Sequence, residues 1–164
     1  MRSGATVDIQ QNEAALMRAV EAWNAGDVDS YMELYTEEIK LHAGTYDFPD
    51  RQAVEGMYKG FHAATSGLRL DIHETFGDGE RLAVRYTVSG THTGELMGIP
   101  PTGREFSMTG ITVMHFEDGS VVERWDSDDS AEVIASLRAE AEATSPSRAQ
   151  HPDSSGSSGR NASR

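Results

Sequence analysis

The residues best suited to chemistry lie in one short run, VVERWDSDD, at positions 121–129. The run begins as an apolar strand and ends with three carboxylates, Asp126, Asp128 and Asp129, next to Trp125. Burial in an apolar site raises the pKa of a carboxylate and suits it to general acid–base catalysis, a contribution of about 10²–10⁴-fold in rate. Asp129 is therefore a candidate acid–base at the mouth of a cavity. The alternative is that Asp128 or Asp129 caps a following helix, a role that aspartate favours.

The turn before this run decides which carboxylate meets His115. A three-residue loop at 117–119, with glycine in the left-handed position, places His115, Trp125 and, by continued alternation, Asp129 on one face. A two-residue Asp-Gly turn shifts the pairing by one and brings Asp126 to His115 instead. We favour the three-residue loop, because an earlier GDG hairpin requires the same turn to align its apolar residues.

The remaining histidines and glycines form no metal-binding or nucleotide-binding motif. The histidines are scattered, with no HExxH sequence and no pair at i,i+4 on one helix. The chain has no cysteine, so disulfides and thiolate metal sites are excluded. Acid–base catalysis without metal or cofactor, and ligand binding without catalysis, are the two function classes that remain.

The first part of the chain is predicted to be mainly helical. Apolar residues recur at helical spacing from Leu16 to Trp23, and Gly26 follows where a helix-terminating glycine belongs. Residues 27–38 predict a short second helix, and residues 39–44 a short strand. A third helix opens at Pro49-Asp50 and carries an apolar stripe.

From residue 68 onward the hydrophobic period changes to two. Residues 68–127 predict antiparallel strands joined by turns, with Phe76 aligned with Leu82, and residues 129–143 predict a final helix. Helices followed by a long meander indicate an α+β fold. A curved, mainly antiparallel sheet wrapped around the N-terminal helices leaves a cavity between them, where a small molecule would bind.

Composition and charge limit the bounds of the folded domain and the classes of partner it can bind. Residues 8–144 are predicted to form one domain, and the Ser/Gly/Arg-rich residues 145–164 a disordered tail. The net charge is −13; because the tail carries three arginines and one aspartate, the remainder carries −15. This acidity argues against a nucleic-acid partner. No run of about 20 apolar residues indicates a membrane span, so we expect a soluble, cytoplasmic protein that binds a small organic molecule.

Two longer runs resemble a known family. THTGELMGIPPTGREF at 91–106 and GITVMHFEDGSVVERWDSDD at 110–129 strongly resemble the SnoaL-like polyketide cyclases, also called ester cyclases, within the NTF2-like superfamily. The resemblance covers about residues 13–136. Each piece alone is a weak signal, but the pieces in this order are specific.

This resemblance implies a cone-shaped α+β fold with a deep apolar pocket and a homo-oligomer, either a dimer or a tetramer. The family's characterised cyclases close a ring on an aromatic polyketide ester by intramolecular aldol condensation, without metal or cofactor. An aspartate in the terminal strand region acts as acid–base, assisted by a histidine one strand earlier. These roles fall on Asp129 and His115, with Asp126 as a further candidate.

The resemblance also implies substrate-binding walls that exclude water around a flat, apolar or aromatic substrate. The candidate wall residues are Trp23, His42, Met57, Phe61, Met108 and Trp125. Two other functions stay open, because one fold hosts many activities. One is an isomerase or epoxide-hydrolase-type enzyme that uses the same acid–base pocket. The other is a non-catalytic small-molecule-binding module in which Asp129 is a helix cap.

Overall fold

The computed structural model describes residues 4–145, and side chains from residue 9 onward. This part of the chain forms four helices and six strands. In chain order they are α1 (Gly4–Asn24), α2 (Val28–Met32), β1 (Tyr35–Ala43), β2 (Tyr46–Phe48), α3 (Arg51–Ala64), β3 (Thr65–Gly77), β4 (Arg81–His92), β5 (Glu105–Glu117), β6 (Ser120–Asp128) and α4 (Ser130–Thr144). The predicted disordered tail lies, except for Ser145, outside the described residues. No helix within residues 4–145 is long and apolar enough to cross a membrane.

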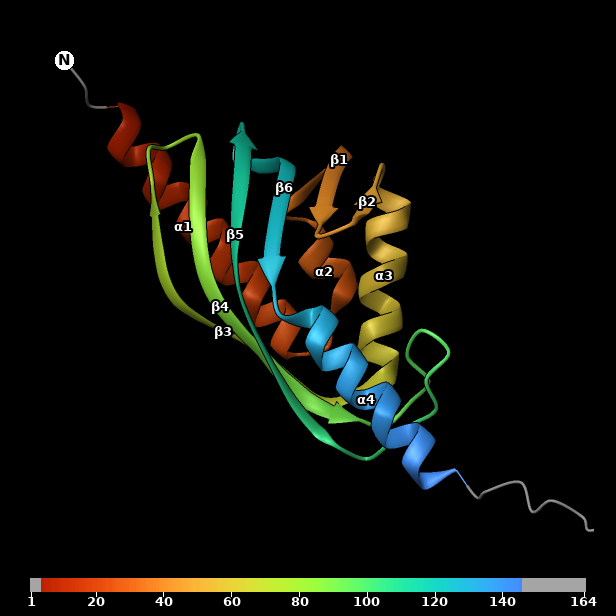
Figure 1. Ribbon diagram of the computed structural model, residues 1–164. Helices are drawn as coiled ribbons and strands as arrows, with labels where there is room; N and C mark the ends of the chain where they lie inside the picture. The colour runs from red at the N-terminus through yellow and green to blue at the C-terminus, as the bar shows by residue number, and fades with distance from the viewer. Residues whose placement is uncertain (1–3, 146–164) are drawn as a thin grey trace, which may run out of the picture.

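The six strands form one curved sheet in the order β2-β1-β6-β5-β4-β3. All neighbouring strands are antiparallel except β1 and β6, which are parallel. Figure 1 shows the long strands bending along their length, with α1 and α2 behind the sheet and α3 beside β2. The predicted α+β class, a curved and mainly antiparallel sheet around the N-terminal helices, is confirmed.

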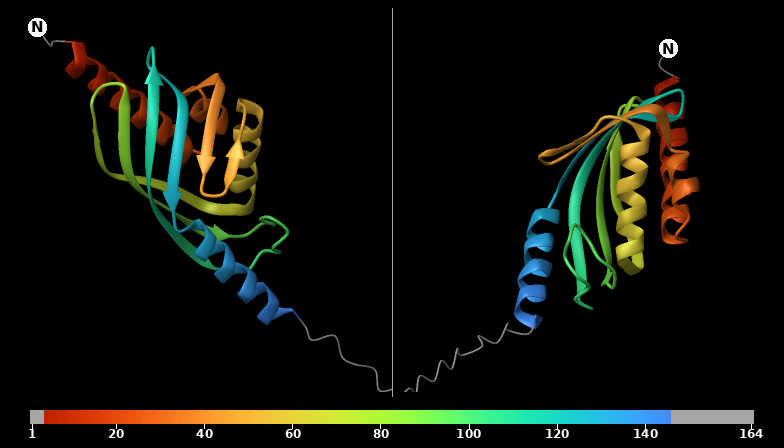
Figure 2. Two further views of the ribbon diagram at one scale, coloured as in Figure 1. Left: turned by 45° about the horizontal axis from the view of Figure 1, so that its top comes forward. Right: turned by 90° about the vertical axis from the view of Figure 1, so that its right-hand side faces the viewer.

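The core fills the space between the sheet's concave face and helices α1, α2 and α3. Strand β4 shows why, because its even-numbered residues Leu82, Val84, Tyr86 and Val88 are buried and alternate with more exposed ones. The C-terminal helix α4 runs beside the first half of β5, on the other side of the strands from α1 and α3 (Figure 2). Its Leu137 packs in a second, smaller apolar cluster near the end of α3.

Two boundaries in the first part of the chain differ from the prediction. The second helix ends at Met32 rather than near residue 38, and the strand predicted at 39–44 already begins at Tyr35. Asp27 caps the helix as expected, since its carboxylate accepts the Ser30 N–H at 3.0 Å. The register shift between Tyr35 and Lys40 hides the strand's alternation, because an irregular strand loses its simple period of two.

The predicted alignment of the first long hairpin is wrong by one residue. Gly77, not Phe76, pairs with Leu82, and Phe76 pairs with Ala83. A register shift between Ile72 and Glu74 reverses the faces of the residues that follow it. Phe76 is therefore exposed instead of facing the core.

The hairpin of β5 and β6 also differs, and this difference relocates the candidate site. Glu117 pairs with Ser120, so the loop has two residues, Asp118 and Gly119, both with positive φ. The favoured three-residue loop is wrong. Val122 is then an extra residue in β6, because the pairing shifts between Phe116–Val121 and His115–Glu123. This bulge turns the following residues to the opposite face from the one that simple alternation from Val121 predicts.

Candidate active site

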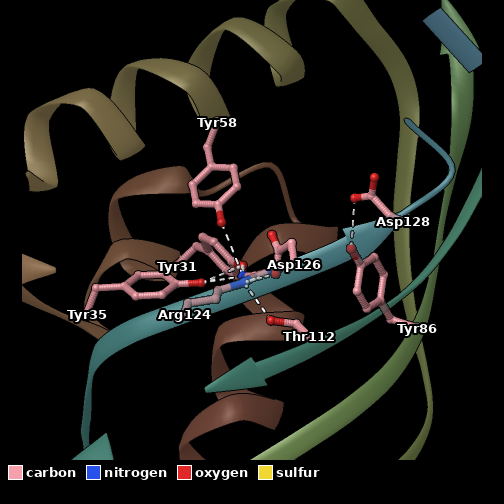
Figure 3. A network of polar contacts seen from close by, with 8 residues as sticks. All are labelled: Tyr31, Tyr35, Tyr58, Tyr86, Thr112, Arg124, Asp126 and Asp128. Atoms are coloured by element: carbon pink, nitrogen blue, oxygen red, sulfur yellow. Dashed lines mark hydrogen bonds and ion pairs between the residues drawn. The ribbon is translucent and has the colours of Figure 1, made fainter. Parts of the chain in front are cut away.

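The inner face of β6 carries a buried ion pair between Arg124 and Asp126 (Figure 3). Arg124 Nε donates to Asp126 Oδ1 at 2.7 Å, and the two side chains are only 8% and 10% exposed. The same Nε also donates to the hydroxyl oxygen of Thr112, at 3.1 Å; Thr112 lies on β5 in register with Asp126. The bulge at Val122 brings these two charged residues inside, and it turns Trp125 between them outward.

Three tyrosine hydroxyls surround the other end of the guanidinium. Arg124 Nη1 lies 2.6 Å from the hydroxyl of Tyr35, and 3.1 Å from those of Tyr31 and Tyr58. The tyrosines come from three elements, α2, β1 and α3 (Figure 3). Trp23 of α1 packs edge-on against the rings of Tyr31 and Tyr58, with centroid distances of 4.9 and 5.3 Å. The short α2 therefore has a local purpose, because it turns Tyr31 toward the sheet.

Burial and charge fix the ionisation of this cluster. Burial raises the pKa of Tyr35 and Tyr58, although the positive charge of Arg124 opposes this effect, so both hydroxyls stay protonated. Burial alone would lower the pKa of Arg124, but the Asp126 carboxylate and the tyrosines raise it well above its usual value. Removing two charges from water costs several kcal/mol per ion unless geometry and hydrogen bonds compensate. A nearly buried ion pair within a cluster of perturbed pKa values is therefore a candidate functional site.

A second polar contact joins Tyr86 of β4 to Asp128 of β6. The Tyr86 hydroxyl donates to Asp128 Oδ2 at 3.1 Å across the intervening strand β5 (Figure 3). Gly110 of β5 lies beneath this contact, and a Cβ there would fall 2.9 Å from the Tyr86 hydroxyl. The other oxygen of Asp128 accepts the Ser130 N–H at 3.0 Å, so this aspartate also holds the start of α4. Burial and the charges of Asp126 and Asp128 raise the pKa of Tyr86.

Some of the predicted wall residues do lie on the inner side. Trp23 is buried in the core, while Met57, Phe61 and Met108 are partly buried and pack against it. The rings of Phe61 and Phe106 are 5.9 Å apart, linking α3 to the first half of β5. These side chains form an apolar surround on the same side of the sheet as Asp126.

Other predicted site residues lie on the outer face. Trp125 is 39% exposed and stacks on His42, with 5.7 Å between ring centroids. His42 lies between two carboxylates, Asp47 at 2.7 Å and Glu123 at 2.9 Å, and these hydrogen bonds raise its pKa, that to Glu123 most. His115 pairs with Glu123 across the hairpin. The prediction that His115 and Trp125 share a face is confirmed, but that face is the outer one.

Asp129 lies at the start of α4 and contacts the neighbouring strand. Its carboxylate accepts the Thr109 N–H at 2.8 Å and the Thr109 hydroxyl at 3.1 Å. It occupies the N-cap position of α4 but makes no side-chain capping bond, which Asp128 supplies instead. The structure does not bring Asp129 together with His115, which lies near the opposite end of β5. Of the predicted carboxylates, Asp126 is the one on the inner face, where its side chain is only 10% exposed.

Two of the hollows on the described part of the molecule lie away from Asp126, which lines neither of them. The larger, of about 720 Å³, lies near the β5–β6 turn, and His115 lines it together with polar residues such as Asn12 and Glu80. The smaller, of about 250 Å³, lies between α1 and the residues that connect α2 to β1. Among the described side chains, those of residues 9–145, no three His, Asp or Glu converge as ligands for a metal ion.

The sequence patterns do not point to the residues that form most of the cluster. Arg124, Tyr31, Tyr35 and Thr112 all lie outside the predicted site. One signal in the sequence is that Arg124 and Asp126 alternate with Trp125, so that either the two charged residues or the tryptophan must face the core. Sequence reasoning places Trp125 inside, because apolar residues are more often buried than charged ones.

This geometry defines a class: an α+β protein whose curved sheet encloses a polar cluster against N-terminal helices. The family model described as SnoaL-like polyketide cyclase matches residues 13–137. The chain belongs to the SnoaL-like polyketide cyclase family, and the predicted resemblance is confirmed.

Curated relatives include ester cyclases of streptomycetes. Aklanonic acid methyl ester cyclase AcmA of Streptomyces galilaeus is 31% identical over 115 residues, which cover 66% of this chain and 77% of the relative. Aklanonic acid methyl ester cyclase DnrD of Streptomyces peucetius is 30% identical, covering 63% of this chain and 74% of the relative.

Solved structures share the fold. AclR of Streptomyces galilaeus, provisionally described as a hydroxylase, has a TM-score of 0.71 at 27% identity, covering 78% of this chain and 96% of its own. IdmH of Streptomyces antibioticus, provisionally described as a polyketide cyclase, has a TM-score of 0.65 at 29% identity, with coverages of 77% and 98%. A SnoaL-like protein of Jannaschia sp. CCS1 reaches 0.71 at 19% identity, covering 79% and 93%, and supports the fold alone.

Proposed function

We propose that this protein is a cofactor-independent cyclase that closes a ring by intramolecular aldol condensation of a polyketide-type ester, with Asp126 as the acid–base. The observation that carries the proposal is the position of Asp126. It is the predicted carboxylate that lies buried on the inner face, next to a fixed cation and a set of apolar side chains. Asp129, the first sequence-based choice, is occupied by its two hydrogen bonds to Thr109.

The chemistry requires one proton acceptor that later returns the proton. The Asp126 carboxylate removes a proton from a carbon between two carbonyl groups, and the electron pair of that C–H bond delocalises as an enolate. The enolate carbon attacks a ketone of the same molecule and forms a C–C bond, and the new alkoxide takes the proton back. Substrate and product are isomers, so the step consumes no oxidant or co-reactant. Holding both reacting carbons in one pocket contributes several kcal/mol through proximity, of the ~7–11 kcal/mol attainable.

The relatives suggest the kind of substrate. The curated relatives are named for aklanonic acid methyl ester, a substrate that carries an ester group. The half-buried Met57, Phe61 and Met108 suit a flat, apolar molecule, and the acidic net charge of −13 disfavours a strongly anionic one. We therefore propose a neutral or weakly acidic aromatic polyketide ester, which binds against the inner face of β5 when the half-buried Met57, Phe61 and Met108 move apart to admit it.

The test is turnover of aklanonic acid methyl ester by the purified protein in ¹⁸O-labelled water, with and without EDTA. The proposal predicts a ring-closed product of unchanged mass, without ¹⁸O, at the same rate in EDTA. Incorporation of one labelled oxygen would indicate a hydrolase instead. Binding of the ester without any product would favour a ligand-binding module.

We also propose that the protein is a homo-oligomer and acts in the cytoplasm. Support for the oligomer comes from the outer face of the sheet, where Ile111 is 47% exposed and Trp125 39% exposed on neighbouring strands. A second copy of this chain would cover these apolar side chains. Light scattering coupled to size exclusion measures the oligomer, and fractionation of the source cells tests the location.

A further inference from the structure

We propose that Arg124 binds substrate directly: its free Nη2 donates to the carbonyl oxygen that becomes the enolate oxygen while Asp126 takes the neighbouring proton. This inference rests on the proposed function, but it assigns a catalytic role to a residue that the sequence patterns do not single out. In this role the pair is more than a structural ion pair: Asp126 is the base, and Arg124 is the cationic hydrogen-bond donor that acts on the adjacent carbonyl oxygen.

The hydrogen-bond pattern of the guanidinium leaves one nitrogen unused. Nε carries one hydrogen and has two acceptors, Asp126 and Thr112. Nη1 carries two hydrogens and has three tyrosine oxygens within 3.1 Å. Nη2 carries two hydrogens and has no hydrogen-bond partner among the side chains of residues 9–145 or the described backbone. An arginine has five donors in a fixed fork, so the acceptors crowd two nitrogens and leave two N–H groups available.

The free donors lie on the same side as the proposed base. In a guanidinium, Nη2 and Nε share one edge, so an Nη2–H points the same way as the Nε–H that Asp126 accepts. Asp126 Oδ1 makes that bond, whereas Oδ2 has no hydrogen-bond partner in the described part of the chain. Figure 3 shows both side chains rising from β6 toward Tyr58 of α3. A carbonyl that meets Nη2 therefore brings its α-carbon next to Oδ2.

The three tyrosines help to aim the guanidinium. Because the pKa of Tyr35 and Tyr58 is raised by burial, both hydroxyls remain neutral and do not neutralise the cation. Thr112 is buried and holds Nε from the adjacent strand. A preorganised cation in a water-poor site stabilises a developing oxyanion more strongly than the same cation does in water.

A β-diketone probe tests this role without requiring turnover. Benzoylacetone ionises to an enolate with its own ultraviolet spectrum, so the enolate fraction bound to protein can be measured at pH 7. An opposite charge within about 4–6 Å favours the ionised form by about 10–1000-fold. We expect wild type and Asp126→Asn to raise the enolate fraction at least tenfold over free probe, and the double variant Arg124→Gln/Asp126→Asn to give no increase. Ser127→Ala, on the outer face of the same strand, is the matched control and keeps the wild-type signal.

Comparing the two variants that both lack the carboxylate separates this inference from the proposed cyclase activity. Equal enolate fractions with Asp126→Asn and the double variant, or no enolate signal with wild type, would overturn the role of Arg124. Full turnover by Asp126→Asn would instead overturn the proposed base. If the double variant does not fold, Arg124→Met/Asp126→Leu replaces it, because apolar residues of similar volume often replace a buried ion pair without loss of stability. An enolate fraction with this variant equal to that with Asp126→Asn would count against the inference.

Discussion

Replacing Gly110 by alanine tests the packing that joins Tyr86 to Asp128. The new Cβ would lie 2.7 Å from Asp128 Cβ, 2.9 Å from the Ser127 carbonyl oxygen and 2.9 Å from the Tyr86 hydroxyl. Two of these three atoms belong to β6 at or next to its backbone, so rotating the tyrosine alone cannot remove the overlap. Overpacking of this kind costs about 1–3 kcal/mol. Loss of the Tyr86–Asp128 hydrogen bond adds about 1 kcal/mol.

The assay is urea denaturation of Gly110→Ala beside Gly60→Ala. Gly60 lies in α3, where an added Cβ would meet nothing within 4 Å, so alanine there should stabilise by up to about 1 kcal/mol. We expect Gly110→Ala to lower the free energy of unfolding by about 2–4 kcal/mol. Tyr86→Phe should lower it by about 1 kcal/mol, and the two changes should be less than additive. Wild-type stability of Gly110→Ala would show that β5 and β6 accommodate the added methyl group without strain.

Three further predictions concern the outer face and the start of α4. Asp129→Ala should lower the free energy of unfolding by about 1 kcal/mol in urea denaturation, because the hydrogen bonds to Thr109 are lost, but it should keep catalytic activity. A loss of turnover at unchanged stability would identify Asp129 as the acid–base instead. His42→Gln should lower the melting temperature at pH 5.5 but not at pH 9. Because the pKa of His42 is raised in the folded protein, its protonation stabilises the fold fully below about pH 6.5, and this stabilisation is lost as the pH rises through the pKa of the folded state. Equal effects of His42→Gln at both pH values would contradict this prediction. Trp125→Glu should reduce the oligomer measured by light scattering, and an unchanged mass would show that this face is not the interface.

The order of elements and the fold class could be predicted because they depend on repeating patterns. A helical period near Leu16 and Trp23, followed by a period of two after residue 68, is enough to indicate helices packed on an antiparallel sheet. The glycine of the β5–β6 turn is also visible in the sequence. Each hydrophobic pattern extends over many residues, so one irregular residue does not change the type of element that it predicts.

The site could not be placed because it depends on single-residue irregularities. Val122 is one extra residue in β6, and it decides that Asp126 and not Trp125 faces the core. Nothing in the local sequence distinguishes a bulge at Val122 from regular alternation, since the choice depends on how β6 pairs with β5. The same holds for Tyr31 and Tyr35, whose hydroxyls meet Arg124 only after three separate elements pack together.

Proton exchange at the substrate's acidic carbon tests the central role of Asp126 most directly. Aklanonic acid methyl ester deuterated at that position is incubated with wild type, Asp126→Asn and Asp129→Asn, and loss of deuterium to water is followed by mass spectrometry. We expect exchange with wild type and Asp129→Asn, and an exchange rate lower by about 10²-fold or more with a folded Asp126→Asn. Exchange by Asp126→Asn at the wild-type rate would contradict this role of Asp126.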